Sequence, residues 1–229
     1  MTFSRDNQQL LQLGHGLMTE FDNFIAFELH KPIIHHLKNI KKGEQVYIYG
    51  EQSTGCSHLA KATCVYHQNL QSVYLPLSTL KFLDRSMLEG IGQVDLICIE
   101  DIDQLAGNKP QQLILFDLIN ICSSHSVSML LTAHIKPGRM DDWLPDLRTR
   151  FQAMCNWQMP SLNDDDKAKI LMDWLDKQNM LLDVEVVHYS FKHINRDLSL
   201  VKSLLESFLK YCMKLKKKPN IRSLREFSS

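Results

Sequence analysis

The chain has 229 residues, of which 44% are hydrophobic and 23% charged, so it can bury the core of one large domain or of two smaller ones. Its 26 Lys and Arg balance its 26 Asp and Glu, which excludes a global field that draws the molecule onto nucleic acid or a membrane. No apolar run approaches the roughly 18 residues of a membrane span, and the six scattered cysteines form no C-x-x-C pair. We therefore expect a cytoplasmic protein with reduced thiols and no zinc or redox motif.

Residues 1–20 are predicted to form a flexible N-terminal arm, because they are polar apart from one short apolar cluster. In that cluster Gln8, Leu11 and Leu13 are spaced so that a flexible segment can dock in a groove on a partner. The alternative, a disordered tail that carries some leucines, stays open. A helix over residues 31–40 follows the arm.

The next part of the chain alternates between strands and helices. Strand-like runs cover residues 46–49, 72–77, 94–99, 128–132 and 154–159. Helical patterns lie between them over residues 57–66 and from Pro110 to residue 121. This alternation predicts an α/β module with a parallel five-stranded sheet that is covered on both faces.

After Pro160 the pattern changes to helices alone. Asn163 precedes three aspartates and is predicted to cap a first helix, with further helices near residues 184–194 and 197–214. We therefore expect a nucleotide-binding α/β base over residues 21–160 and a small all-helical domain over residues 161–229.

Residues 50–57, Gly-Glu-Gln-Ser-Thr-Gly-Cys-Ser, match a phosphate loop with one departure. The pattern G-x-x-x-x-G-K-[ST] keeps Gly50, Gly55 and Ser57, but Cys56 stands where a lysine would reach the β- and γ-phosphates. Main-chain N–H groups hold the phosphates in such loops, so these donors remain without the lysine, and Ser57 can still meet Mg²⁺. The alternative is a strand-turn-helix corner with glycines for tight packing.

Charged residues add four further candidate sites. Glu100 and Asp101 follow an apolar strand, and at the carboxyl end of a parallel strand they are expected beside the phosphate loop, where they can organise Mg²⁺ and a water. Arg150 and Arg196 are candidates for phosphate contact, because a guanidinium group matches the geometry of a phosphate. Taken alone, each is equally explained as a solvated surface charge. The basic run 214–218 is explained by a helix end more simply than by contact with DNA.

Together the order and spacing of these motifs resemble the DnaA-like AAA+ family of replication proteins. The segments that carry the resemblance are Phe21-Asp22-Asn23-Phe24, Tyr74-Leu75-Pro76-Leu77, Asp95 to Asp103 with Ala106-Gly107, Phe116 to Asn120, Leu144-Pro145-Asp146-Leu147 and Arg196-Asp197-Leu198. The resemblance implies an AAA+ base followed by a helical lid. Because Cys56 replaces the family's lysine and Glu100 its first aspartate, ATP hydrolysis by this chain is in doubt, and the implied cofactor is ADP, with or without Mg²⁺.

The resemblance also implies roles for individual residues. The diphosphate would lie among Gly50, Thr54, Gly55, Cys56, Ser57 and His58. Ser57, Glu100 and Asp101 would hold the metal, Thr132 or His134 would be the first sensor, and Arg196 would be the sensor arginine of the lid. Arg150 matches an arginine finger that acts in trans, and Gln8, Leu11 and Leu13 match three positions of a clamp-binding motif.

The function implied is that of a regulator rather than an enzyme. It would bind ADP and the DNA-loaded sliding clamp of DNA polymerase III, and it would stimulate ATP hydrolysis by DnaA to inhibit re-initiation of replication. Contact with DNA would be indirect or weak, with no membrane partner, and a homodimer is left open. The alternatives are a P-loop ATPase that acts as a helicase loader, a nucleotide-independent adaptor and a DNA-binding regulator.

Overall fold

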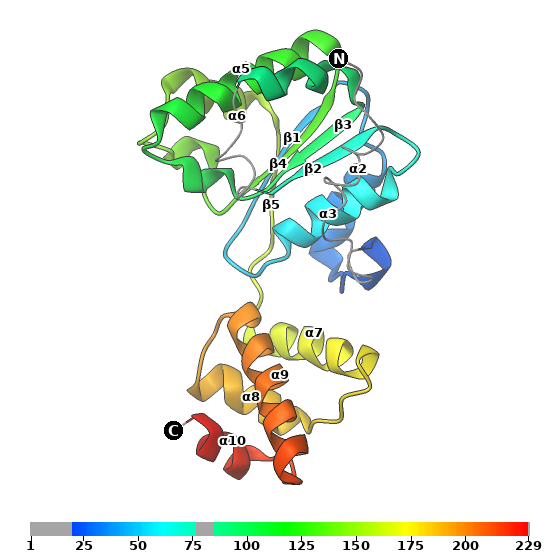
Figure 1. Cartoon of the computed structure of the whole chain (residues 1–229), viewed down its shortest axis with the longest axis vertical. Helices are drawn as coiled ribbons and strands as arrows, with labels where there is room; N and C mark the ends of the chain where they lie inside the picture. The colour runs from blue at the N-terminus through cyan, green and yellow to red at the C-terminus, as the bar shows by residue number, and fades with distance from the viewer. Residues whose placement is uncertain (1–19, 77–84, 229) are drawn as a thin grey trace. The chain divides into compact units, whose positions relative to one another are not determined.

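A computed structural model describes residues 20–76 and 85–228, so Gln8, Leu11 and Leu13 lie outside the described residues. The chain divides into two compact units, Met1–Pro160 and Ser161–Ser229. The first unit contains a sheet between layers of helices, and the second is built from helices (Figure 1).

The sheet of the first unit confirms the predicted fold class. Its strands are β1 (Gln45–Tyr49), β2 (Ser72–Leu75), β3 (Leu96–Ile99), β4 (Ser128–Ala133) and β5 (Cys155–Gln158). They lie in the order β2-β3-β4-β1-β5, and all four pairings are parallel. Because the strands share one direction, the residues that follow β1, β3 and β4 meet at a single edge of the sheet.

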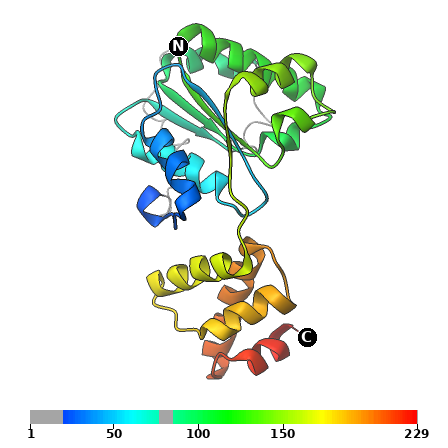
Figure 2. The same ribbon diagram turned by 180° about the vertical axis from the view of Figure 1, so that it is seen from behind.

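Helices cover both faces of this sheet, as the two opposite views show (Figures 1 and 2). One face carries α2 (Lys31–Lys38) and α3 (Cys56–Tyr66), and the other carries α5 (Lys109–His125) and α6 (Pro145–Ala153). Along β1, Val46 and Ile48 pack toward α2 and α3 while Tyr47 packs toward α5 and α6. Since the central strands β1, β3 and β4 are buried on both sides, their sequences are largely continuous apolar runs, whereas the edge strand β5 exposes Asn156 and Gln158. Short 3-10 segments complete the unit: η1 (Phe21–Asn23), η2 (Glu28–His30), η3 (Arg85–Gln93), η4 (Ile102–Leu105) and η5 (Pro137–Arg139).

Two helices of the first unit differ from the expectation. The helix predicted over residues 31–40 ends at Lys38, where the side-chain amide of Asn39 donates a 2.8 Å hydrogen bond to the carbonyl oxygen of His35. Helix α6 was not predicted. It begins at Pro145 and buries Leu147 and Phe151, four residues apart, so its sequence signals are a proline at the first helical position and a short apolar stripe.

Within the described residues of the second unit, 161–228, the helices are α7 (Asp164–Lys177), α8 (Val184–His193), α9 (Leu198–Leu215) and α10 (Ile221–Ser228). As predicted, the side chain of Asn163 caps α7, accepting the N–H of Asp166 at 2.8 Å. Helix α10 was not predicted, and it packs Ile221, Leu224 and Phe227 against the core of this unit. In residues 20–76 and 85–228, none of the helices combines the length and the apolar character needed to cross a bilayer.

Candidate nucleotide-binding site

The predicted phosphate loop connects β1 to α3, which is the strand–loop–helix context that such a loop requires. The N–H of Gly50 donates to the carbonyl oxygen of Ala133 at 3.2 Å, so the start of the loop is joined to the end of β4. The first helical hydrogen bond runs from the N–H of Leu59 to the carbonyl oxygen of Gly55 at 2.9 Å. The N–H groups of Cys56 and Ser57 precede that bond, at a helix end where the dipole favours an anion.

Both glycines of the loop are required by its geometry. Gly55 has a φ of +97°, in the left-handed region that L side chains rarely adopt. A Cβ at Gly50 would lie 2.7 Å from Cβ of Met159 and 2.8 Å from Oγ1 of Thr54. The hydroxyl of Thr54 donates to the carbonyl oxygen of Glu51 at 2.7 Å, which closes the loop on itself. The loop is therefore fixed by the backbone and does not depend on the missing lysine.

The Cys56 side chain is directed into the protein and only 4% of it is exposed. Its sulfur lies 3.6 Å from the hydroxyl oxygen of Thr54. Burial raises the pKa of the Cys56 thiol to about 11, the polar contact with Thr54 acts in the opposite direction, and the charge of Asp101 adds to the increase. The thiol is therefore neutral at physiological pH, and this position contributes packing to the core below α3 where the family pattern has a cation.

The acidic strand end and the first-sensor position are adjacent. Asp101 follows β3 and its N–H donates to the hydroxyl oxygen of Thr132, at the end of β4, over 3.1 Å. Oδ1 of Asp101 is buried without a hydrogen bond and lies 3.6 Å from Nε2 of His134. Nδ1 of the same imidazole lies 3.2 Å from the carbonyl oxygen of Gly50. His134 thus joins the phosphate loop to the acidic strand end.

The carboxyl group of Asp101 has a raised pKa. Burial is the largest cause, His134 opposes it, and Glu100 adds to the increase. The carbonyl oxygen of Gly50 can only accept, so Nδ1 of His134 carries the hydrogen of that contact. Burial therefore disfavours the ionised form of Asp101 at this strand end.

Replacing Asp101 by asparagine is therefore expected to stabilise the protein near neutral pH. A carboxyl group whose folded-state pKa is raised contributes stability below its unfolded pKa, and loses it as the pH rises through the folded value. The gain in the free energy of unfolding should shrink toward zero as the pH falls to about 4 and below, where the aspartic acid of wild type is as neutral as the asparagine of the variant. Urea unfolding of wild type and Asp101→Asn across this pH range measures the gain. If Asp101→Asn is less stable than wild type at neutral pH, the attraction between Asp101 and His134 exceeds the cost of burying the carboxylate, and the prediction is wrong.

Lys61 is a site residue that the sequence reasoning missed. Its ammonium nitrogen lies 3.9 Å from Oε2 of Glu100 and 5.3 Å from the centroid of the Tyr74 ring. Side chains on a helix lean toward its N-terminus, so a lysine in the second turn of α3 reaches the strand end. Lys61 is the single lysine of α3, and this was the available signal. A cation therefore stands beside the predicted metal ligand Glu100 although Cys56 supplies none.

The two arginines lie in different units. Arg150 is on α6, and its guanidinium carbon lies 4.7 Å from the centroid of the Phe116 ring on α5. Both helices cover the face of the sheet opposite α3. Arg196 is exposed in the second unit, directly before Asp197, which caps α9 by accepting the N–H of Leu200 at 2.9 Å.

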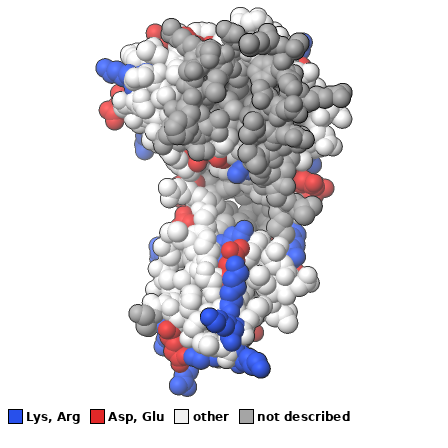
Figure 3. Space-filling model, in the orientation of Figure 1, with Lys and Arg blue, Asp and Glu red and all other residues white. Residues whose placement is uncertain are grey.

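The basic run of the second unit is partly neutralised. Lys217 pairs with Glu226 at 2.9 Å, and Arg222 lies 3.5 Å from the same carboxylate. Figure 3 shows basic and acidic side chains interspersed on the visible face of this unit. This favours the helix-end explanation of the run over a dedicated surface for DNA.

The residues of the loop and strand ends fit a bound nucleotide. The backbone frame of the loop presents N–H donors that suit a diphosphate. For Mg²⁺, which prefers oxygen ligands, Oδ1 of Asp101 is a buried oxygen without a hydrogen bond, and Ser57 supplies a hydroxyl on the loop side.

The class of protein follows from comparison with solved structures. Domain III of the replication initiation protein DnaA from Thermotoga maritima superposes with a TM-score of 0.79 and 17% identity, over 91% of this chain and 95% of that chain. AMPPCP-bound DnaA from Aquifex aeolicus gives 0.69 and 19%, over 84% of this chain and 65% of that chain. The RuvB Holliday junction branch migration motor of Thermotoga maritima gives 0.68 and 14%, over 91% and 70%. The chain therefore has the AAA+ P-loop fold of DnaA domain III.

The relationship by sequence is more specific. No protein-family model matches the chain. An uncharacterised protein of Haemophilus influenzae is 30% identical over 155 residues, which are 66% of this chain and 67% of that protein. The chain belongs to the same family as this Haemophilus protein.

Proposed function

We propose that this protein is a DnaA-like AAA+ regulator that holds ADP in the loop between β1 and α3. The observation that carries the proposal is the condition of that loop: its glycine frame is intact while Cys56 is buried and neutral. Main-chain donors suffice to hold a diphosphate, whereas fast hydrolysis of ATP needs a cation at the β- and γ-phosphates. By the order and spacing of its motifs the chain resembles Hda, the short DnaA-related inactivator of DnaA.

Each part of the loop has a role in this proposal. The N–H groups of Cys56, Ser57 and His58 would hold the phosphates, and the hydroxyl of Ser57 would be a ligand for Mg²⁺. Mg²⁺, when bound, would neutralise charge on the phosphates. Thr132 fixes the backbone of Asp101, and Arg196 is the residue of the helical unit that would read the nucleotide.

Arg150 would act on a partner rather than on this chain's own nucleotide. It lies on α6 with α5, whereas α3 packs on the other face of the sheet. Stacking on Phe116 holds the guanidinium in place on a half-buried surface. We propose that it enters the ATP site of DnaA and stabilises the charge of phosphoryl transfer there.

The remaining partners follow from the sequence. Gln8, Leu11 and Leu13 would bind the sliding clamp on DNA, which raises the effective concentration of the regulator near replicating DNA. Contact with DNA itself would be weak, because Glu226 already pairs with Lys217 and Arg222. The result would be inhibition of re-initiation.

Titration with ADP tests the proposal. We expect one ADP per chain, and we expect ADP at 100 times its dissociation constant to stabilise the first unit by about 2.7 kcal/mol in thermal or chemical unfolding. The isolated chain should not turn over ATP. Absence of any ADP binding would favour the nucleotide-independent adaptor, and steady ATP turnover would favour the helicase loader. Either result contradicts the proposal.

A further inference from the structure

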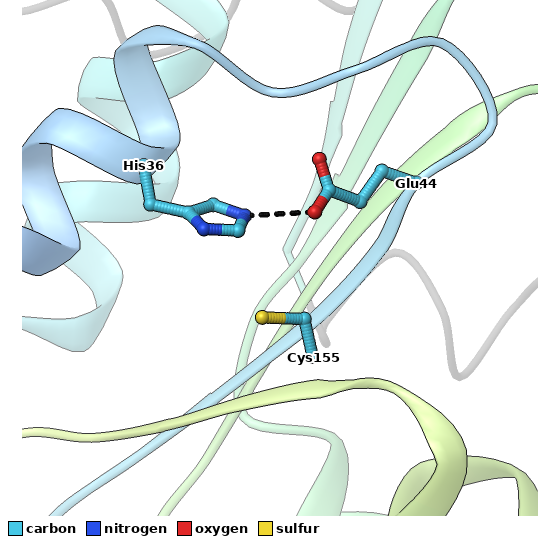
Figure 4. A group of neighbouring side chains, drawn as sticks. All are labelled: His36, Glu44 and Cys155. Carbon is cyan, nitrogen blue, oxygen red and sulfur yellow. Dashed lines mark ion pairs between the residues drawn. The ribbon is translucent and has the colours of Figure 1, made fainter.

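Three potential metal ligands meet at the edge of the sheet where its strands begin (Figure 4). His36 is on α2, Glu44 directly precedes β1, and Cys155 is the first residue of β5. β1 and β5 are parallel neighbours with Val46 opposite Cys155. The phosphate loop follows the other end of β1, so this cluster is separate from the nucleotide site.

The donor atoms of the cluster are close enough to share one ion. Nε2 of His36 lies 3.0 Å from Oε1 of Glu44, and one imidazole nitrogen, one carboxylate oxygen and Sγ of Cys155 all lie within 4.8 Å of one another. Ligands of a tetrahedral zinc ion, at about 2.0–2.3 Å from the metal, are roughly 3.3–3.8 Å apart. Figure 4 shows the imidazole and the thiol directed toward the space beside the carboxylate. Small side-chain rotations therefore bring all three into range.

The surroundings of Glu44 already orient it as a ligand. Its second oxygen, Oε2, accepts the backbone N–H of Lys41 at 2.9 Å, which leaves Oε1 for His36 or a metal ion. In metal sites, hydrogen bonds of this kind hold the coordinating side chains in the orientation that the metal ion needs. The side chains of His36 and Glu44 are 22% and 24% exposed, so an ion can enter and a water can complete its coordination.

The thiol of Cys155 is likewise placed for a metal. Nε1 of Trp157 is buried and has no hydrogen-bond partner by geometry, and Trp157 lies two residues along β5, on the same face as Cys155. A thiolate at Cys155, bound to a metal ion, would give this indole N–H an acceptor.

We propose that His36, Glu44 and Cys155 form a zinc site, with water as the fourth ligand. One nitrogen, one carboxylate oxygen and one sulfur suit Zn²⁺, whereas Mg²⁺ and Ca²⁺ require oxygen ligands. A neutral imidazole, a carboxylate and a thiolate together carry two negative charges and balance the ion, and one proton leaves the thiol as the Zn–S bond forms. The site would join α2 to the first residues of β1 and β5.

Binding of metal to the whole protein tests this proposal. Wild type should take up one Zn²⁺ per chain in competition with a chromophoric chelator, and the melting temperature should rise as it does so. Co²⁺ bound in place of Zn²⁺ should give a thiolate-to-metal charge-transfer band in the near ultraviolet. Cys155→Ser should lose the band and weaken zinc binding at least tenfold, and His36→Asn should weaken binding similarly. The matched control is Cys212→Ser, which removes a buried thiol from the other unit and should leave both readouts unchanged.

The outcomes separate clearly. If wild type binds no Zn²⁺ in the competition, or if Co²⁺ gives no thiolate band, the site does not exist. Binding that is unchanged in Cys155→Ser would overturn it equally. The Co²⁺ spectrum of wild type decides the question even if a variant fails to fold, as circular dichroism would show.

Discussion

Replacing Arg150 by alanine is expected to abolish the stimulation of ATP hydrolysis by DnaA while leaving ADP binding by this chain unchanged. An arginine delivered in trans to a phosphoryl-transfer site is worth about 10³–10⁵ in rate, or roughly 4–7 kcal/mol of transition-state stabilisation. The side chain stacks on Phe116 at the surface of α6, away from the α3 face, so its loss should not disturb the phosphate loop. Single-turnover hydrolysis by DnaA, measured with loaded clamp, gives the rate.

Two control variants sharpen this prediction. Arg148→Ala removes a neighbouring guanidinium on the same helix, 3.9 Å from Asp141, and should leave most of the stimulation intact. Arg150→Lys should restore little of it if the contact with phosphate is bidentate, because an ammonium is only a point charge. Unchanged stimulation by Arg150→Ala would refute the finger assignment, with ADP binding by the same variant as the internal check.

Replacing Gly55 by alanine is expected to destabilise the first unit and to abolish nucleotide binding. At a φ of +97° an L residue costs about 1–3 kcal/mol, and the added Cβ would lie 2.6 Å from Cε2 of Phe24. The aromatic ring must move, which adds roughly 1–3 kcal/mol of overpacking. Because Phe24 also packs edge-on against His58, at 5.3 Å between ring centroids, its movement displaces the first turn of α3 as well.

The chain offers a matched control for that glycine. Gly107 also has a positive φ, +73°, but a Cβ there meets nothing within 4 Å. Gly107→Ala therefore carries the backbone strain without the collision, and should lose less stability while keeping ADP binding. Urea unfolding followed by tryptophan fluorescence measures both variants, since Trp143 and Trp157 lie in the first unit. Equal losses from the two substitutions would show that the contact with Phe24 contributes nothing.

The centre of the sheet was predictable because β1, β3 and β4 are buried on both faces. A run such as Leu-Ile-Cys-Ile over β3 must be apolar at every position when helices cover both sides, and this signal is visible without any tertiary information. The short helices α6 and α10 escaped prediction, since each is stabilised mainly by packing a few apolar residues onto a core formed elsewhere. The end of α2 differed from the prediction because the side chain of Asn39 takes the carbonyl oxygen of His35 as its acceptor, where a continuing helix would use a backbone N–H.

The sequence predicted the backbone loop of the candidate nucleotide site, but not the contacts that side chains make around it. The spacing of Gly50, Gly55 and Ser57 identified the loop, because its conformation depends on where glycine is required. The approach of Lys61 to Glu100, and the bridge that His134 makes between Gly50 and Asp101, depend on how α3 and β4 are placed beside β3. Such distances have no counterpart in residue spacing.

The sequence by itself determined the layered α/β fold, the helical end of the chain and the loop without its lysine, because periodicity and glycine positions are local properties. Only the tertiary structure decided that the thiol of Cys56 is buried and neutral, since burial depends on what packs against it. It alone brought Cys155 beside His36 and Glu44, because Cys155 is distant in sequence from the other two and the three residues match no metal-binding spacing. Parallel pairing of β1 with β5 creates that proximity, and strand pairing is a long-range contact that short sequence patterns do not encode.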